Sequence, residues 1–375
     1  MIKKLFLCAV LCLMLAACGQ GAPARQTDTA AQKMPLTYAQ QFSVDRMDNG
    51  CALIHIDTET FLLVPENVET PAHDDNVKVL KQPIAPIYLS ATAAADLFDA
   101  IGALDCVTMT STAADGWDLP AIKKAVDEGR IEYIGKYSAP DYEVLAESGC
   151  GLAIESTMIY HSPETKEQIE NLGIPVLTER SSYEAHPMAR LEWVKLYGLL
   201  VGREDEANKL FDEKQREFEE TLASVQKDGK RPTAAFFYLS PKGHVNIRKP
   251  GDYVSKMIEL AGGEYIFTAD KLNVDENALS TMNIQLEEFY ETAKDADVII
   301  YNSTIEGEIA DIDTLKAMSP VFEDFRAVQN GNVWCAEKNM FQQTTGVADT
   351  VADLEKIFSG KADDEDRLEF MHRLK

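Results

Sequence analysis

The sequence is poor in positive charge. Among 375 residues it has 36 lysines and arginines against 62 aspartates and glutamates, a formal net charge of −26. Binding to phosphate groups requires clustered lysine and arginine, so this balance argues against nucleic acid or an anionic lipid surface as a partner. The chain can still build sizeable cores, because 45% of its residues are hydrophobic and its length allows two domains.

Familiar catalytic and metal-binding motifs are also missing. The sequence contains no GxSxG, HExxH, GxGxxG or Walker loop, and no two of its six histidines are four residues apart. We therefore expect neither a catalytic set nor a metal site. An enzyme of another kind remains an alternative, either a cell-surface α/β hydrolase or a metal-insertion enzyme on a two-lobed scaffold.

Cysteine is scarce beyond the N-terminal segment. Of seven cysteines, four lie beyond residue 18, at irregular spacing and without a CxxC pair: Cys51, Cys106, Cys150 and Cys335. A chain of this size does not need disulfides for stability. We expect buried free thiols, with one disulfide as the alternative that export would allow.

The N-terminus indicates export. An apolar run over residues 5–15 follows two lysines, and it is too short for a transmembrane helix. The Leu-Ala-Ala-Cys motif that ends at Cys18 resembles the lipobox of bacterial lipoproteins. This resemblance implies a signal peptide over residues 1–17 and a diacylglycerol group on Cys18. We expect a lipid anchor on the extracytoplasmic face of a bacterial membrane, with residues 18–35 as a flexible tether.

The middle of the chain is dominated by helical spacing. Apolar residues recur every three or four positions over Glu204–Gln226, and Gly202 separates this pattern from a shorter one over Met188–Val201. On both sides, short apolar runs alternate with amphipathic stretches, which is typical of parallel sheets covered by helices. We predict an α/β fold: two lobes with mostly parallel sheets joined by a single long α-helix, plus an N-terminal β-hairpin unit. One large α/β domain with a surface helix is the alternative.

The predicted boundaries follow these patterns. The N-terminal lobe covers residues 36–186 and contains a hairpin at 42–65, the interlobe helix covers 187–230, and the C-terminal lobe covers 231–360. Residues 361–375 are mostly charged, so they are predicted to be a solvated tail.

Short apolar runs mark the expected strands, and the loops after them are where open α/β sheets bind ligands. The predicted strands are Ile87–Leu89, Cys106–Met109, Gly151–Glu155, Pro175–Leu177, Ala234–Leu239, Val298–Tyr301 and Val333–Ala336. Ser240–Gly251 is rich in basic residues, glycine and proline, and is predicted to be a loop.

Four stretches resemble one family of transport proteins. Lys136–Glu155 is similar to a block found in periplasmic binding proteins, and Ile284–Ile300 repeats it loosely in the second lobe. Glu259–Gly263 and Val328–Val333 resemble two further blocks of that family. The resemblance covers about Val79–Phe358. It implies the substrate-binding component of an ABC importer for ferric siderophores, haem or cobalamin.

The same resemblance implies how the protein meets its partner, an ABC permease with its ATPase. Members of the family carry one exposed glutamate on each lobe, which docks onto arginines of the permease. By position, Glu143 matches in the first lobe, and either Glu287 or Glu288 matches in the second. Two separated carboxylates fix the register of such a complex electrostatically.

The ligand is expected between the lobes, on the loops after the strands. Aromatic rings offer flat apolar contact to a macrocycle or catechol, and arginines offer charge-assisted bonds to an anionic complex. The candidate contacts are Tyr160, Tyr183, His186, Arg190, Arg248, Lys249 and Phe341.

The predicted function is a lipid-anchored receptor that delivers a ferric siderophore to the permease, without catalysis and without a cofactor of its own. Two other ligands remain open. Haem would be held by an axial Tyr160, Tyr183 or His186. Cobalamin or another corrinoid is the remaining alternative.

Overall fold

The structure is a computed structural model that describes residues 32–225, 229–362 and 367–375. The expected signal peptide, the expected lipid site at Cys18 and the tether up to residue 31 lie outside the described residues. The tether predicted over 18–35 is too long, because Gln32–Lys33 form strand β1. In the part of the chain that the structure describes, no helix has the length and apolar character needed to cross a membrane.

An N-terminal sheet of five strands precedes the first lobe. β2 (Phe42–Arg46) and β3 (Ala52–Ile56) form the predicted hairpin, whose turn contains Gly50 at φ 83°. β4 (Glu59–Val64) lies within the predicted range 42–65, and the unit is wider than predicted because β5 (Lys78–Lys81) extends one side and β1 pairs with β2 on the other. The strands are antiparallel except for the β4–β5 pair.

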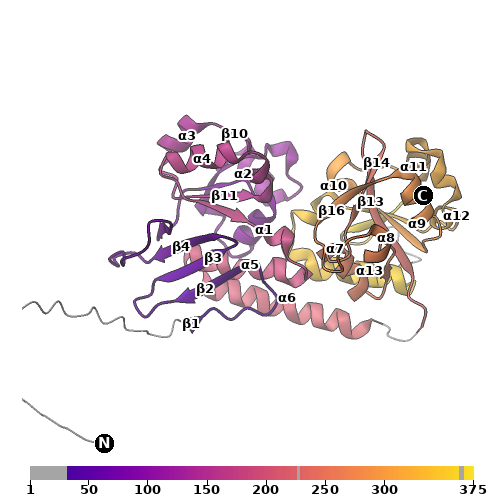
Figure 1. Ribbon diagram of the computed structural model, residues 1–375, viewed down its shortest axis with the longest axis horizontal. Coiled ribbons are helices and arrows are strands. Elements are labelled where there is room, and N and C mark those ends of the chain that lie inside the picture. The colour runs from indigo at the N-terminus through magenta and orange to yellow at the C-terminus, as the bar shows by residue number, and fades with distance from the viewer. Residues whose placement is uncertain (1–31, 226–228, 363–366) are drawn as a thin grey trace, which may run out of the picture. The chain divides into compact units, whose positions relative to one another are not determined.

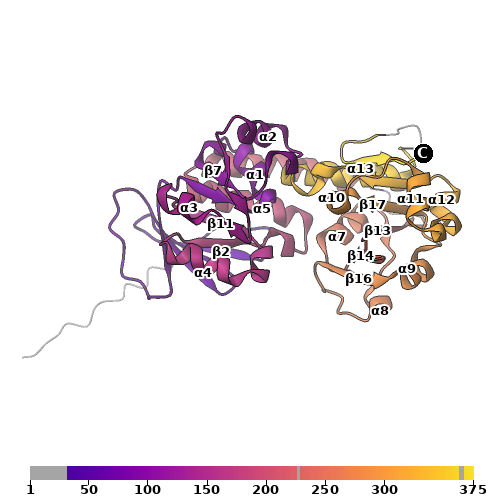
Figure 2. The same ribbon diagram turned by 90° about the horizontal axis from the view of Figure 1, so that it is seen from above.

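A parallel sheet in the order β12-β11-β6-β7-β8 forms the N-terminal lobe, hereafter the N-lobe (Figure 1). Successive strand residues face opposite sides. Leu89 and Ile154 therefore share a core with α1 and α2, whereas Tyr88 and Ala153 share a core with α3 and α4, and the two helix pairs lie on either side of the strands (Figure 2). The elements are β6 (Ile87–Leu89), α1 (Thr92–Ala100), β7 (Val107–Thr110), α2 (Pro120–Asp127), β8 (Glu132–Tyr133), β9 (Gly135–Lys136), β10 (Ala139–Pro140), α3 (Tyr142–Glu147), β11 (Leu152–Ser156), α4 (Pro163–Asn171) and β12 (Val176–Glu179).

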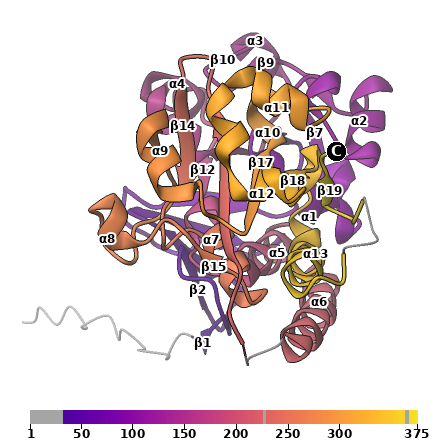
Figure 3. The ribbon, with the colours of Figure 1, turned by 90° about the vertical axis from the view of Figure 1, so that its right-hand side faces the viewer.

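The C-terminal lobe, hereafter the C-lobe, has a mixed sheet in the order β16-β14-β13-β17-β18-β19, with β15 beside β13. Phe237 packs on Phe289 of α9, and the preceding Phe236 faces the other side of β13 and packs on Phe341. The C-lobe faces the viewer in Figure 3. The elements are β13 (Thr233–Leu239), β14 (His244–Arg248), α7 (Tyr253–Leu260), β15 (Glu264–Tyr265), α8 (Ala269–Leu272), β16 (Thr281–Gln285), α9 (Leu286–Ala293), β17 (Val298–Asn302), α10 (Ser303–Glu306), α11 (Ile312–Met318), α12 (Arg326–Gln329), β18 (Val333–Ala336), α13 (Val347–Ser359) and β19 (Met371–Arg373).

Two predictions for the C-lobe are wrong. Ser240–Gly251 is not a loop throughout, because β14 lies within it and pairs antiparallel with β13 and β16. Residues 361–375 are not a solvated tail, because β19 pairs antiparallel with β18 and both Phe370 and Leu374 are buried. In each segment, buried apolar residues lie among charged or polar neighbours. Because of these charged neighbours, the alternation of apolar and polar residues that is typical of a strand was not recognised in the sequence.

The segment 187–230, predicted as the interlobe helix, contains two consecutive helices instead of one, and they match the two patterns on either side of Gly202. α5 (Pro187–Val201) ends at Gly202, whose φ is 71°, and α6 (Glu204–Ser224) follows with 21 residues. Gly198 permits their close approach, because a Cβ at this position would lie 2.6 Å from the Cβ of Ala207. α5 is buried along almost its whole length, and α6 packs against α5 and α13 (Figure 1).

Two buried carboxylates of the α5 region hold the N-terminal segment in place. The backbone N–H groups of residues 37–39 donate to Glu192 at 2.7–2.8 Å, and those of residues 40–41 donate to Glu184 at 2.9–3.2 Å. Lys195 also donates to Glu192, at 2.8 Å. A buried carboxylate is tolerated when hydrogen bonds compensate its charge. The segment and the helix therefore depend on each other.

The four cysteines of the described residues are free thiols. Cys51, Cys150 and Cys335 are buried and Cys106 is half-buried, so the first of the two expectations for cysteine holds. Burial raises the pKa of Cys335 to about 12. This thiol therefore stays protonated and unreactive at neutral pH.

Replacement of Phe370 by alanine should destabilise the protein. The ring is fully buried and touches Gly346 so closely that a Cβ there would clash with it. Because its removal leaves a cavity, we expect the free energy of unfolding to fall by about 3–5 kcal/mol. Urea unfolding followed by circular dichroism measures the loss. Glu369→Ala, at the exposed neighbouring position, is the matched control, and an equal effect of both variants would contradict a packed C-terminal strand.

Candidate functional site

A cavity of about 380 Å³ lies between the lobes, at the carboxyl ends of their parallel strands. Its walls come from the segments that follow β6 and β7 in the N-lobe and β17 and β18 in the C-lobe. Open α/β sheets place their ligands at this edge. The lining residues include Thr92 and Asp118 from the N-lobe and Ile305, Lys338, Phe341 and Gln342 from the C-lobe.

Gln342 bridges the two lobes at the wall of the cavity. The backbone N–H of Asp118 donates to Oε1 of Gln342 at 2.9 Å, and Nε2 of Gln342 donates to the carbonyl of Gly116 at 2.9 Å. Close by, the hydroxyl of Thr344 donates to the carbonyl of Ala93 at 2.8 Å. Hydrogen bonds of this neutral kind contribute about 1 kcal/mol each. These bonds join the lobes, but they are weak enough for a ligand of moderate affinity to rearrange them.

Behind Phe341 the lobes meet in a buried cluster of two arginines and two aromatic rings. The guanidinium of Arg190, on α5, lies 4.3 Å from the centre of the Tyr253 ring, and that of Arg248 lies 4.7 Å from the centre of the Phe341 ring. Asp252 lies 3.6 Å from Arg248, and burial raises the pKa of this carboxyl while Arg248 opposes the rise. The structure thus brings together three predicted contacts, Arg190, Arg248 and Phe341. Sequence reasoning missed Asp252 and Tyr253.

Arg190 is short of hydrogen-bond partners. The residue is 3% exposed, its Nε has no acceptor, and one terminal nitrogen makes only a long contact of 3.5 Å to the carbonyl of Phe341. Among the described residues, no carboxylate lies within ion-pair distance of its guanidinium. Its nearby counter-charges, the buried carboxylates of Glu179 and Asp252, act on it through space and not through a hydrogen bond. The cluster is therefore suited to a nearby anionic group.

Two other predicted contacts gather around Arg180 and do not line the cavity. Arg180 donates to the hydroxyl of Tyr160 at 2.9 Å, and its guanidinium lies 5.1 Å from the centre of the Tyr183 ring. Tyr160 is 46% exposed. Arg180 also pairs with Asp57 of the N-terminal sheet at 3.2 Å. Sequence reasoning missed Arg180, although its place directly after β12 was a usable signal.

His186 and Lys249 also lie outside the cavity lining. Nδ1 of His186 accepts from the backbone N–H of Met188 at 3.2 Å, so His186 caps α5, and its ring stacks on Tyr38 at 4.5 Å. Burial lowers the pKa of His186 to about 4, so the ring is neutral near pH 7 and able to accept this bond. These contacts account for His186 without a ligand. Lys249 is half-buried beside Arg248.

The three glutamates predicted to dock lie in the first turns of two helices. Glu143 is the second residue of α3, and Glu287 and Glu288 are the second and third residues of α9. All three are exposed. A buried apolar residue lies two positions after Glu143 in α3 and two positions after Glu287 in α9: Leu145 and Phe289. By helix position Glu287 is therefore the counterpart of Glu143.

Glu155, at the carboxyl end of β11, is a further polar group that sequence reasoning missed. It is fully buried, and neither carboxylate oxygen has a hydrogen-bond partner of good geometry among the described residues. Burial raises its pKa to about 7, and the nearby Ser90 hydroxyl opposes the rise only in part. Ser90 begins the loop that carries Thr92 into the cavity wall. The apolar run of β11 gave no sign that its glutamate points inward.

Two comparisons of sequence identify similar proteins. Residues 90–339 match the pattern of the family described as periplasmic binding protein. An uncharacterized lipoprotein of Methanocaldococcus jannaschii is 28% identical over 283 residues, which cover 72% of this chain. The match spans 63% of the length of that relative. The family match includes most of the cavity lining but not Phe341 and Gln342, and it leaves out the N-terminal sheet and β19.

Solved structures of low sequence identity share the fold. A possible iron-binding periplasmic solute-binding protein of Staphylococcus epidermidis has a TM-score of 0.55 at 17% identity, over 72% of this chain and 97% of its own. The triscatecholate siderophore-binding protein of Bacillus subtilis has a TM-score of 0.57 at 16% identity, over 77% and 98%. A periplasmic haem-binding protein of Vibrio cholerae has a TM-score of 0.56 at 16% identity, over 72% and 97%. The predicted α/β fold with two lobes is thus confirmed.

Stability should depend on pH through Glu155. The pKa of Glu155 is about 7 in the folded state against an ordinary value of 4.5, so the folded state binds the proton more tightly than the unfolded state does. The stability that this proton contributes is complete below pH 4.5 and is lost as the pH rises through 7. Glu155→Gln removes this loss. We expect the variant to gain roughly 3 kcal/mol over the wild type between about pH 5 and about pH 8. Urea unfolding at both pH values, with exposed Glu147→Gln as control, measures the gain, and parallel pH profiles of wild type and Glu155→Gln would refute it.

Proposed function

The chain belongs to the periplasmic binding protein family, and we propose that it is the lipid-anchored substrate-binding component of an ABC importer for a ferric siderophore. Members of this family are solute-binding proteins rather than enzymes, and they deliver small-molecule chelates to ABC permeases. The proposed anchor is a diacylglycerol group on Cys18. The lipobox-like motif and the lipoprotein relative both support it.

The shortage of hydrogen-bond acceptors at Arg190 is the observation that carries the choice of ligand. Two buried guanidiniums, Arg190 and Arg248, lie behind the Phe341 ring, and that ring lines the cavity. Rotation of Phe341 would open both cations to the cavity. Charge-assisted bonds between arginine and the oxygen atoms of an anionic chelate are strong in such a dry site. A ferric catecholate, which is anionic and aromatic, suits this combination.

Haem is the second candidate, and one observation favours it. Tyr160 is exposed, and its hydroxyl accepts a hydrogen bond from Arg180. A tyrosine oxygen is an axial ligand of haem iron in some proteins. A Soret shift on adding haemin, abolished by Tyr160→Phe, would support this candidate over the siderophore. No contact described above favours a corrinoid.

Docking on the permease completes the proposal. Glu143 and Glu287 hold equivalent positions in α3 and α9, both exposed in a first helical turn, so they offer one carboxylate on each lobe. We propose that these two, rather than Glu288, contact the permease.

Ligand binding is tested by quenching of tryptophan fluorescence. Trp117 lies between Gly116 and Asp118 of the cavity wall, so a coloured chelate in the cavity should quench it most. The panel contains ferric catecholate and hydroxamate siderophores, haemin and cobalamin. We expect saturable quenching by the catecholate, reduced in amplitude in Trp117→Phe, and at least tenfold weaker binding in Arg190→Gln, because an arginine–anion bond in a buried site is lost. The exposed Arg130→Gln is the control, and equal affinity in both arginine variants would argue against the anionic site.

Docking is tested by uptake in cells. Glu143→Arg and Glu287→Arg reverse a charge at each proposed contact, so we expect them to abolish uptake of the ligand while the purified variants bind it as the wild type does. Glu147→Arg and Glu288→Arg carry the same change on the same helices and should transport normally. Normal uptake by Glu287→Arg together with loss in Glu288→Arg would reverse the assignment.

A further inference from the structure

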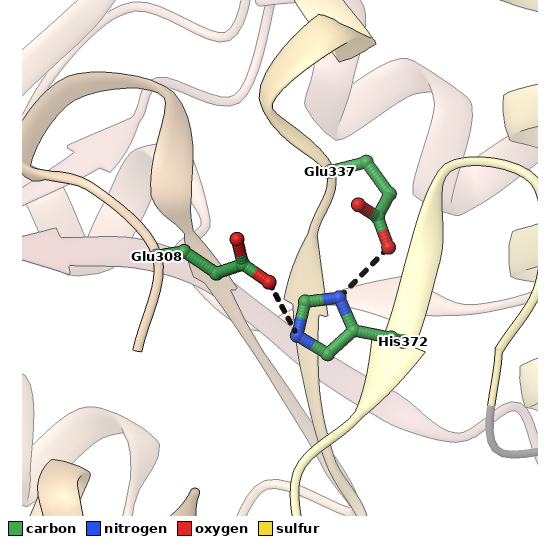
Figure 4. A group of neighbouring side chains, drawn as sticks. All are labelled: Glu308, Glu337 and His372. Atoms are coloured by element: carbon green, nitrogen blue, oxygen red, sulfur yellow. Dashed lines mark hydrogen bonds and ion pairs between the residues drawn. The ribbon is translucent and has the colours of Figure 1, made fainter. Parts of the chain in front are cut away.

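Three ionisable side chains meet beside the cavity (Figure 4). Nδ1 of His372 lies 2.9 Å from Oε1 of Glu337, and Nε2 of the same ring lies 3.6 Å from Oε1 of Glu308. Each of the three residues offers a ligand atom, and these atoms lie within 4.8 Å of one another. Figure 4 shows the two carboxylates facing opposite nitrogens of the imidazole.

The fold brings these residues together from three separate segments. Glu308 follows α10, Glu337 directly follows β18, and His372 lies on β19, which pairs with β18. Two of their chain neighbours, Gly307 and Lys338, line the cavity. The cluster therefore lies at the carboxyl edge of the C-lobe sheet.

The two histidine contacts differ in a way that points to a metal ion. The 2.9 Å contact to Glu337 is a normal hydrogen bond, whereas 3.6 Å to Glu308 is too long for one. Two metal bonds of about 2.1 Å at an angle of about 110–120° place their ligand atoms about 3.4–3.6 Å apart. The spacing of His372 Nε2 and Glu308 Oε1 fits this geometry.

The remaining contact supplies what a metal-binding histidine needs. A metal-bound imidazole donates its other N–H to a carboxylate or carbonyl, which fixes the ring orientation and the tautomer. Glu337 holds this position, and it is largely buried, with a side-chain exposure of 12%. An imidazole nitrogen and a carboxylate oxygen together favour a first-row transition metal over Mg²⁺ or Ca²⁺.

We propose that His372 and Glu308 bind one divalent first-row transition-metal ion, with Glu337 as the positioning residue for the imidazole. The ion ties β19 to the loop after α10. Water fills the remaining coordination positions. The proposal does not depend on the identity of the transported ligand, and His372 lies outside the residues that match the family pattern.

The competing explanation for the three neighbouring side chains is an imidazolium paired with two carboxylates, without a metal ion. Arg367 lies 2.9 Å from Glu337 and Lys338 lies 3.9 Å from Glu308, so two cations already accompany the acids. Both are well exposed, with side-chain exposures of 70% and 48%, and water screens their charges. The two explanations differ in whether the cluster takes up Zn²⁺.

The test is calorimetric titration of the full-length protein, purified in detergent and stripped with EDTA, with Zn²⁺. We expect one saturable ion per chain, not displaced by excess Mg²⁺ or Ca²⁺. Glu308→Gln and His372→Ala should abolish binding, and Glu337→Gln should weaken it about 10- to 100-fold. Zn²⁺ should also raise the melting temperature of the wild type but not that of Glu308→Gln.

His55→Ala is the matched control. Like His372, His55 has a carboxylate near its Nε2, that of Asp45 at 3.4 Å, but its other nitrogen faces the hydroxyl of Thr60 and not a carboxylate. This variant should bind Zn²⁺ as the wild type does. Glu308 is exposed, so the melting temperature of Glu308→Gln in EDTA should equal that of the wild type. This result would show that the variant has lost the metal site and not the fold. Absence of saturable binding in the wild type, or wild-type binding in Glu308→Gln, would overturn the proposal in favour of the imidazolium.

Discussion

The structure depends on compensation of the charges buried along and just before α5. Glu184 and Glu192 accept five backbone N–H groups from residues 37–41, which fixes the N-terminal sheet to the helix. Arg190, between them in sequence, faces the C-lobe instead and stacks on Tyr253. Buried carboxylates therefore tie the N-terminal sheet to this helix, and Arg190 adds a contact from the same helix to the C-lobe. The ligand cluster is one part of this arrangement.

Much of the fold could be predicted because the local periodicity of hydrophobic residues indicates its helices and strands. The parallel strands are buried on both faces and appear as short apolar runs, and the pattern over Glu204–Gln226 matches α6 to within two residues. β14 and β19 escaped prediction, since each has few residues and charged or polar neighbours, and β19 also pairs with a strand that is distant in sequence. Pairing over such distances is not recorded in local composition.

The candidate site was predictable in part, for a similar reason. Arg190, Arg248 and Phe341 were expected near the cleft because they follow strands, and the structure places them in one cluster. His186, chosen by the same rule, instead caps a helix, because the rule locates a loop but not the direction of a side chain. Asp252 and Tyr253 were hidden because they resembled the start of an ordinary helix.

Strand β19 closes one edge of the C-lobe sheet. Leu374 donates to Val333 at 2.9 Å, and the carbonyl of Lys375 accepts from Ile312 at 3.1 Å. Until residues 371–375 have been synthesised, β18 keeps an unpaired edge beside the cavity. The N-lobe precedes β19 in the chain, so it can fold during synthesis while this edge is still open. The edge of β18 beside the cavity is therefore completed only after the N-lobe has been synthesised.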